Sequence, residues 1–310
     1  MSQNTSVTVQ KVSFPHGTHQ VVGNLFLPPG FDETKKYAAF PVTHPFGGVK
    51  EQTSGLYARH LAEQGFITLA YDASHYGESG GEPRLYEVPG DRVEDIRCAV
   101  DYLSNQPQVD PDRIGALGIC AGGGYTVNAA QTEMRIKAVA GVSTFDLGSA
   151  RREGVGGGIS REQRIATLEE VGRQRTREAR GEEIRYFSLV PENPQDALNN
   201  PSDLYREGYI YYGQVAPHPR AMDRFVFSTL SAQQQFFPFQ EIETISPRPL
   251  LLIAGSNADT LYFSQNAYNK AKEPKELHLV DGATHIDLYY KPDYVPQVAG
   301  KLTEFFAKNL

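Results

Sequence analysis

The chain has 310 residues, of which 40% are hydrophobic and 22% are charged, and its formal net charge is −7. This composition can build a sizeable core and excludes a disordered chain, and the acidic balance argues against a nucleic-acid or anionic-membrane partner. Two cysteines are too few for a disulfide framework, which predicts a reducing compartment. Because the N-terminus lacks a signal-peptide pattern and no apolar run could span a bilayer, we expect a cytoplasmic protein.

Short β-rich runs that alternate with helical patterns predict an α/β fold, with a mostly parallel eight-stranded sheet and helices on both faces. Residues 6–14 and 19–28 alternate in hydrophobicity and are expected to form an antiparallel pair. Buried, mostly parallel strands are predicted at 38–44, 66–72, 113–119, 136–143, 249–255 and 276–282. Helices are predicted at 54–65, 92–106, 120–131 and 295–310.

The interval between the strands that end near residue 143 and begin near residue 249 is too long for a plain crossover. It contains a Gly-rich stretch, a charged helical pattern over 160–180 capped by Ser160, and Pro- and Tyr-rich pieces with little β pattern. We therefore predict a mainly helical lid over 147–245, inserted into a core formed by 1–146 and 246–310. The lid aromatics are expected to line an apolar pocket, to hold the lid to the core or to form a homodimer interface; they are Tyr209, Tyr211, Tyr212, Phe225, Phe227, Phe236, Phe237 and Phe239.

Two stretches compete as the site of a catalytic nucleophile. The run GESGG at 77–81 matches the serine pattern G-x-S-x-G, whereas GALGICAGGGY at 115–125 has a cysteine in the place of the serine. A nucleophile elbow requires a strand before it, small residues around the turn and a helix after it. Cys120 has all three, whereas Ser79 is separated from its strand and is followed by prolines. Cys120 is therefore the predicted nucleophile, and we place Ser79 in a glycine-rich loop.

A nucleophilic thiol also needs a base, and the base needs a group that orients it. His285 is the predicted base, because it follows the last core strand and precedes the closing helix. Asp259, just beyond strand 249–255, is the predicted acid, and Asp146 is the alternative. The position of Cys120 at a helix N-terminus predicts a lowered thiol pKa.

The oxyanion hole requires two backbone N–H donors. Ala121, which directly follows the nucleophile, is the predicted first donor. The second is expected from the HPFGG loop after strand 38–44, where Phe46 is the leading candidate and Gly47 the next. His44 in the same loop is interpreted as a structural residue.

Several long motifs occur in the same order as in a known superfamily: HPFGGVKEQ, LYARHLAEQGF, YGESGGEPR, GICAGGGY, SPRPLLLIAG, YFSQNAY and GATHIDLYY. With these motifs the chain resembles the α/β-hydrolases, and more narrowly the dienelactone-hydrolase-like group with a cysteine nucleophile, in a bacterial branch allied to the fungal polyketide transferases (thiohydrolases). The resemblance implies no metal and no organic cofactor. It also implies a triad of Cys120, His285 and either Asp259 or Asp146, and members of the branch often lack an aspartate at the position of Asp259.

The leading functional hypothesis is cleavage of an activated ester, thioester or lactone through an acyl-cysteine intermediate, on a small molecule with an apolar acyl or lactone part. Acyl transfer to an alcohol or amine is an alternative, and a non-catalytic receptor on the same fold is another. The set of Cys120, His285 and an acid argues against the receptor, which would have no need to keep it. Because a thiolate leaves more easily than an alkoxide, aryl esters, enol lactones and thioesters should react faster than ethyl esters.

Overall fold

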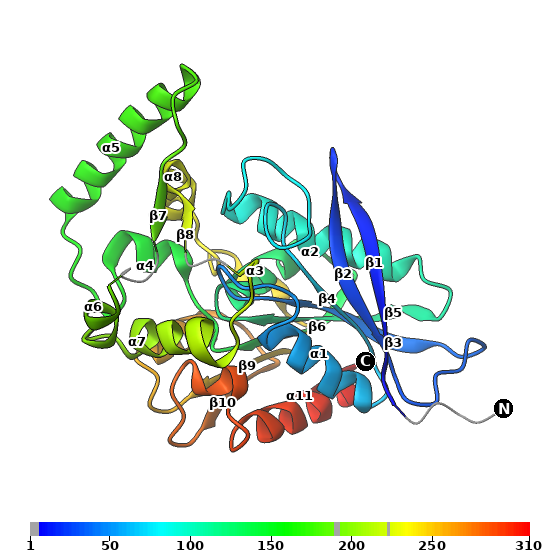
Figure 1. Cartoon of the computed structure of the whole chain (residues 1–310). Helices are drawn as coiled ribbons and strands as arrows, with labels where there is room; N and C mark the ends of the chain where they lie inside the picture. Colours follow the sequence, from blue (N-terminus) through cyan, green and yellow to red (C-terminus); the bar gives the residue numbers. More distant parts are fainter. Residues whose placement is uncertain (1–5, 189–192, 222–223) are drawn as a thin grey trace.

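The computed structural model describes residues 6–188, 193–221 and 224–310. Its centre is an eight-stranded sheet, in the spatial order β1 (Thr8–His16), β2 (His19–Leu27), β4 (Ile67–Tyr71), β3 (Tyr37–Thr43), β5 (Val109–Ile119), β6 (Ile136–Val142), β9 (Leu250–Gly255) and β10 (Lys275–Val280) (Figure 1). β1 pairs antiparallel with β2, and β2 pairs antiparallel with β4, while the remaining neighbours are parallel. The predicted mostly parallel eight-stranded sheet is therefore confirmed.

The central strands are mostly apolar because both faces of the sheet are covered. All residues of β4 and β9 are buried, whereas the outer strand β1 is half-buried or exposed at every residue except the buried Phe14. α1 (Thr53–Glu63) contacts α11 (Val295–Asn309), and α2 (Pro89–Ser104) contacts α3 (Ala121–Ala130), each pair covering one side of the sheet (Figure 1). α2 begins at Pro89, a little before the predicted residue 92, because proline is well suited to the first turn of a helix.

The segment between β6 and β9 is mainly helical. It contains α4 (Leu147–Glu153), α5 (Arg161–Ala179), β7 (Tyr186–Ser188), α6 (Pro194–Leu198), α7 (Asp203–Ile210), the π-helical turn η1 (Tyr211–Val215), β8 (Arg224–Val226), η2 (Phe227–Thr229), α8 (Leu230–Gln234) and η3 (Ile242–Ile245). β7 and β8 form a small antiparallel pair that the sequence did not predict. A three-residue strand is too short for a recognisable period.

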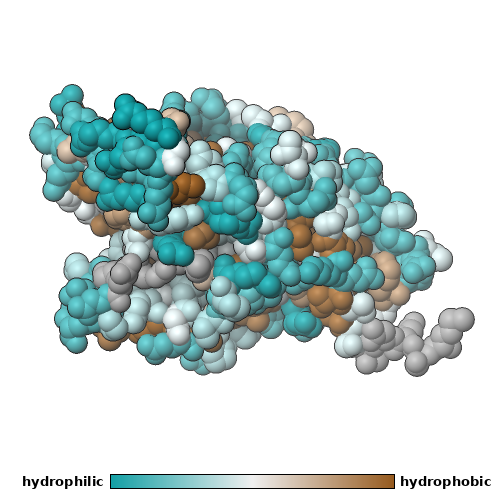
Figure 2. All heavy atoms as spheres, turned by 45° about the horizontal axis from the view of Figure 1, so that its top comes forward, coloured by the Kyte–Doolittle hydropathy of each residue, from teal (hydrophilic) through white to brown (hydrophobic). Residues whose placement is uncertain are grey.

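α5 projects from the rest of the molecule (Figure 1). Ser160 caps it as predicted, by accepting a hydrogen bond from the Gln163 N–H in a capping box. Only Val171 and Gln174 of this helix are buried, and the lobe around it has a mostly hydrophilic surface (Figure 2). Within the described residues, no helix has both the length and the apolar character to cross a membrane.

After β10 the chain forms the short helix α10 (Asp287–Tyr290) before it enters α11. α9 (Leu261–Lys270) occupies the corresponding place after β9. The loops that precede these two helices follow the carboxyl ends of parallel strands. This is the edge of an open α/β sheet at which ligands bind.

Candidate active site

Cys120 lies at the sharp turn between β5 and α3. Its φ of 56° and ψ of −125° lie outside the ordinary regions for a residue with a side chain, and such strain persists only where neighbouring structure enforces it. The Cys120 N–H donates to the Val142 carbonyl at 2.9 Å, and the Phe145 N–H donates to the Cys120 carbonyl at 3.0 Å. These bonds from β6 and from the loop after it hold the strained elbow that the sequence predicted.

Two glycines allow the first turn of α3 to approach its neighbours closely. A Cβ at Gly118 would lie 2.2 Å from the Gly122 carbonyl oxygen, and a Cβ at Gly122 would lie 2.5 Å from the Thr43 carbonyl oxygen. Both contacts are with backbone, which cannot move aside as a flexible side chain could. The glycines around the elbow therefore bring Cys120 against the loop that follows β3.

The Cys120 side chain is 7% exposed, and this burial raises its thiol pKa to about 11. Hydrogen bonds from the Tyr289 hydroxyl and from backbone N–H groups act in the opposite direction but are weaker. The expectation of a lowered pKa was wrong, because desolvation of the thiolate outweighs the favourable position at the helix N-terminus. In the free protein the thiol is protonated near neutral pH.

Two backbone N–H groups converge on the Cys120 sulfur. They belong to Ala121 and Phe46, and their hydrogen bonds to the sulfur lower the thiol pKa. These are the two leading donors predicted for the oxyanion hole, one from the elbow and one from the loop after β3. Gly47 lines the same cavity with a φ of 70°, and no hydrogen bond between Gly47 and the sulfur occurs within the described part of the chain.

A buried ion pair supports the loop that carries Phe46. Arg92 on α2 pairs with Glu87 at 3.0 Å and donates to the His44 carbonyl at 2.8 Å. Tyr125 on α3 donates to the same carboxylate at 2.6 Å. The loop and the elbow helix are therefore joined through one carboxylate, which fixes the spacing of the two predicted oxyanion-hole donors.

The far end of this loop is held by Lys50, which is 1% exposed. Its ammonium lies 2.7 Å from an Asp72 carboxylate oxygen, and its backbone N–H donates to the other oxygen of that carboxylate at 2.8 Å. The His44 ring accepts a hydrogen bond from the Ala73 N–H at 3.0 Å, and burial places the His44 pKa well below its ordinary value. His44 is a neutral structural residue, as predicted.

His285 is 1% exposed and follows β10, where the sequence placed it. Its Nδ1 lies 2.6 Å from the Thr260 hydroxyl, and its Nε2 lies 3.2 Å from the Tyr289 hydroxyl. Burial lowers the imidazole pKa to about 3, so the ring is neutral in the free protein. The tautomer with the proton on Nδ1 donates to Thr260 and leaves Nε2 as a proton acceptor.

Neither predicted acid is hydrogen-bonded to His285 among the residues described. Asp259 accepts hydrogen bonds from the Ser202 hydroxyl at 2.6 Å and from the Leu204 N–H at 3.2 Å, so it caps the start of α7. Asp146 is the N-cap of α4 and accepts from the Ser149 N–H at 2.8 Å. The structure therefore supports neither aspartate as the orienting group and places the Thr260 hydroxyl there instead.

The surroundings of Ser79 are also unlike those of a catalytic nucleophile. Its buried hydroxyl donates to the Asp72 carbonyl at 2.6 Å and accepts from the Val22 N–H at 2.8 Å. Both bonds join a loop to β2 and to the end of β4. The literal G-x-S-x-G match is a structural loop, as predicted.

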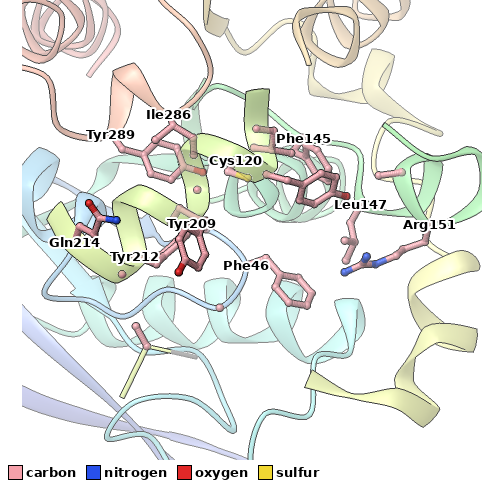
Figure 3. Close-up of a pocket in the computed structure, with 18 residues that line it drawn as sticks. Phe46, Cys120, Phe145, Leu147, Arg151, Tyr209, Tyr212, Gln214, Ile286 and Tyr289 are labelled. Atoms are coloured by element: carbon pink, nitrogen blue, oxygen red, sulfur yellow. The ribbon is translucent and has the colours of Figure 1, made fainter. Parts of the chain in front are cut away.

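A cavity of about 350 Å³ opens over Cys120 (Figure 3). The core contributes side chains from the elbow, from the loop after β3, from the loop after β6 and from α10. The segment between β6 and β9 contributes the rest: Leu147, Ala150, Arg151, Leu204, Tyr205, Gly208, Tyr209, Tyr212, Gly213, Gln214 and Ala221. Of the predicted pocket aromatics, Tyr209 and Tyr212 line this cavity.

The other lid aromatics lie elsewhere. Tyr211 is buried against Tyr289, with their ring centroids 5.2 Å apart, and Phe225 packs edge-on against Phe46 at 5.3 Å. Phe237 is half exposed. Some of these aromatics therefore hold the segment to the core, as the alternative interpretation expected.

Arg151 on α4 brings a positive charge to the cavity wall (Figure 3). Its guanidinium lies over the rings of Phe46 and Phe225, at 5.4 Å and 4.8 Å from their centroids. Nε donates to the Gln233 side chain at 2.8 Å, whereas Nη2 is buried and has no hydrogen-bond partner in the described ranges. No carboxylate of those ranges forms an ion pair with it, and burial lowers its pKa.

Sequence reasoning missed Thr260, Tyr289 and Arg151. Tyr289 stands four residues after His285, a spacing that places two side chains on one side of a helix and could have indicated it. Thr260 directly follows the predicted acid Asp259. No sequence pattern indicated Arg151 as a cavity residue, because a charged residue in a predicted lid is usually solvated.

The chain is similar to a known protein family and to individual proteins. The model of the dienelactone hydrolase family matches residues 29–145, which contain both the elbow and the Phe46 loop. The uncharacterized protein YcjY of Escherichia coli K12 is 39% identical, over 97% of this chain and 99% of its own. The chain belongs to the dienelactone hydrolase family.

Two further proteins are similar to this chain over most of its length. The crystal structure of the hypothetical protein PA2218 from Pseudomonas aeruginosa superposes with a TM-score of 0.92 at 36% identity, over 100% of this chain and 96% of that one. The thiohydrolase aneE of Aspergillus aculeatus is 27% identical over 71% of this chain and 69% of its own. This member of the dienelactone hydrolase family is a hydrolase that acts on ester bonds.

Proposed function

We propose that this protein cleaves activated esters, thioesters or lactones through an acyl intermediate on Cys120, with His285 as the base. The observation that carries the proposal is the convergence of the Phe46 and Ala121 N–H groups on the sulfur at a strained elbow. Cys120 has no packing role that would require a thiol at this position. The likeness to a fungal thiohydrolase supports thioesters among the substrates.

In the proposed reaction, Sγ attacks the substrate carbonyl carbon and its proton passes to His285. The Phe46 and Ala121 N–H groups stabilise the negative charge that develops on the carbonyl oxygen. The tetrahedral intermediate collapses when the leaving group departs with the proton held by the imidazolium, and an acyl-cysteine remains. Attack by water, with His285 again as the base, releases the acid and restores the thiol.

The high thiol pKa of Cys120 favours substrates with good leaving groups. The thiol pKa of about 11 makes a deprotonated Cys120 a better leaving group than an ethoxide. The intermediate formed from an ethyl ester therefore returns mostly to the starting ester. An aryl ester, an enol lactone or a thioester releases a group of lower basicity, so its acyl transfer to Cys120 goes forward.

The cavity indicates a mainly apolar acyl part that ends in an acceptor group near Arg151. A buried cation without an anionic partner costs several kcal/mol, and a carboxylate or carbonyl oxygen of the substrate would accept a hydrogen bond from Nη2 of Arg151, which is unpaired among the described residues. The aromatic walls, with Phe145 and Tyr209 among them, would hold the chain between this end and Cys120. We expect Arg151→Met to lower kcat/KM for the p-nitrophenyl monoester of glutaric acid much more than for p-nitrophenyl pentanoate. Equal losses of kcat/KM on both esters would contradict the proposed hydrogen-bond acceptor of the substrate near Arg151.

The test of the nucleophile is mass spectrometry of the intact protein, quenched with acid during turnover of p-nitrophenyl butyrate. In a Cys98→Ala background Cys120 is the single thiol of the chain, and we expect one butyryl adduct, mapped to the peptide that contains it. Adding Cys120→Ala should remove the adduct and the turnover. An adduct that persists in this double variant would overturn the proposal. Product analysis with added alcohols then separates hydrolysis from acyl transfer.

A further inference from the structure

Tyr289 lies between the nucleophile and the base. Its hydroxyl is 3.2 Å from Nε2 of His285 and is also hydrogen-bonded to the Cys120 side chain. Figure 3 shows the Tyr289 hydroxyl directed toward the Cys120 sulfur. One phenol therefore contacts both groups between which a proton must move.

The described residues provide no direct hydrogen bond between Cys120 and His285. Cys120 and Tyr289 both line the cavity, whereas His285 is not among the described residues that line it. A proton that leaves the sulfur therefore meets the phenol oxygen before it can reach the imidazole.

The Tyr289 ring is held in this position by its neighbours. It is 1% exposed, and Tyr211 packs edge-on against it with ring centroids 5.2 Å apart. The His285 ring lies 5.6 Å away on the same helix–loop segment. This packing and burial restrict rotation of the Tyr289 side chain and favour a hydroxyl position between the two groups.

The charge states of Cys120, Tyr289 and His285 require two proton transfers to be coupled. One transfer runs from the thiol to the phenol, and the other runs from the phenol to the imidazole. Burial raises the Tyr289 pKa well above its ordinary value, so a phenolate is not a stable intermediate. The imidazole is neutral, and the thiol is protonated. A phenol that accepts one proton while it gives up another never carries a charge, which avoids the cost of a buried phenolate.

We propose that Tyr289 is a catalytic residue that relays the proton of Cys120 to His285; this rests on the acyl-cysteine function proposed above. As the sulfur attacks the substrate carbonyl, the S–H proton moves to the Tyr289 oxygen and the original phenol proton moves to Nε2 of His285. The products of this step are a neutral Tyr289, an imidazolium and a tetrahedral adduct with one negative charge. When the leaving group departs, the same two movements run in reverse and deliver a proton to it, so no other reactant is needed.

The experiment compares Tyr289→Phe with the matched control Tyr290→Phe, both in a Cys98→Ala background. Both substitutions remove one hydroxyl from adjacent positions of α10, and the Tyr290 hydroxyl has no hydrogen bond in the described part of the chain. The first readout is kcat/KM for p-nitrophenyl acetate. We expect Tyr289→Phe to lower it by about 100-fold or more, the usual contribution of a positioned acid–base group, and Tyr290→Phe to change it by less than about threefold.

The second readout is the rate of Cys120 alkylation by iodoacetamide as a function of pH. Loss of the phenol removes a hydrogen bond that favours the thiolate, so the midpoint of this profile should move to higher pH in Tyr289→Phe alone. An unchanged midpoint would show that the phenol does not contact the sulfur, and it would overturn the relay. Activity of Tyr289→Phe within threefold of the parent would also overturn it.

A third variant tests whether the phenol instead blocks contact between the sulfur and the imidazole. Tyr289→Ala should be at least as impaired as Tyr289→Phe if the hydroxyl is the relay, and activity at or above the parent level would show that the ring is a block. Cys120→Ala separates this proposal from the one on which it rests. If Cys120→Ala keeps its activity, the acyl-cysteine function fails, whereas an inactive Cys120→Ala with a fully active Tyr289→Phe refutes the relay alone.

Discussion

The Thr260 hydroxyl occupies the place in which a carboxylate was expected, and its removal gives a direct test of how His285 is oriented. Thr260→Val keeps the branched shape of the side chain and deletes the partner of Nδ1, which lies 2.6 Å away in a buried environment. A buried polar group left without its partner costs about 1–3 kcal/mol. If that cost falls on the transition state, kcat/KM decreases by roughly 5- to 150-fold.

The assay is the initial rate of p-nitrophenyl acetate hydrolysis, with thermal unfolding recorded for each variant. Thr260→Ser retains the hydroxyl and should recover most of the activity. Asp259→Asn and Asp146→Asn should stay within about threefold of the parent, whereas an acid that holds the catalytic histidine costs about 10⁴-fold when it becomes an amide. A loss of that size in either aspartate variant, together with an active Thr260→Val, would refute the reasoning.

Four further outcomes follow from the geometry and from the ionisation of the buried groups. Ser79→Ala should leave kcat/KM within a few-fold and lower the free energy of unfolding by about 1–3 kcal/mol, because its buried hydroxyl joins two backbone groups; a catalytic loss of a hundredfold would contradict this. Gly122→Ala should abolish activity and lower the melting temperature, because the new Cβ would lie 2.5 Å from a backbone oxygen, whereas Gly172→Ala on α5 meets no atom within 4 Å and should be harmless. The pH profile of kcat/KM should be flat between about pH 5 and about pH 9, because the pKa of His285 is about 3 and that of Cys120 about 11. Since the His285 pKa is depressed below 6.5 in the folded state, its contribution to stability should be complete above about pH 6.5 and be lost as the pH falls; urea titrations across this range would measure it.

The sequence alone determined the sheet, the elbow and the position of His285 after the last strand. Strand runs such as ITLAY and LLLIAG are apolar at almost every position, and this local property indicates a covered parallel strand. The choice of Cys120 over Ser79 also rested on local context, because a strand, a turn of small residues and a helix must be contiguous in the chain. The Phe46 and Ala121 donors followed from the same order of elements.

Only the tertiary structure decided how the catalytic groups meet. Thr260, Tyr289 and His285 come from two segments that follow different strands, and which hydroxyl faces which ring nitrogen depends on how α9 and α10 pack. Both predicted acids instead cap helices of the segment between β6 and β9, because an aspartate beside the first turn of a helix accepts hydrogen bonds from the free N–H groups there. The direction in which the Cys120 pKa shifts likewise depends on burial. Burial is the result of contacts with residues that are distant in the chain. Local pattern specifies where a side chain is placed along an element, and the packing of elements against each other determines its partners and its charge.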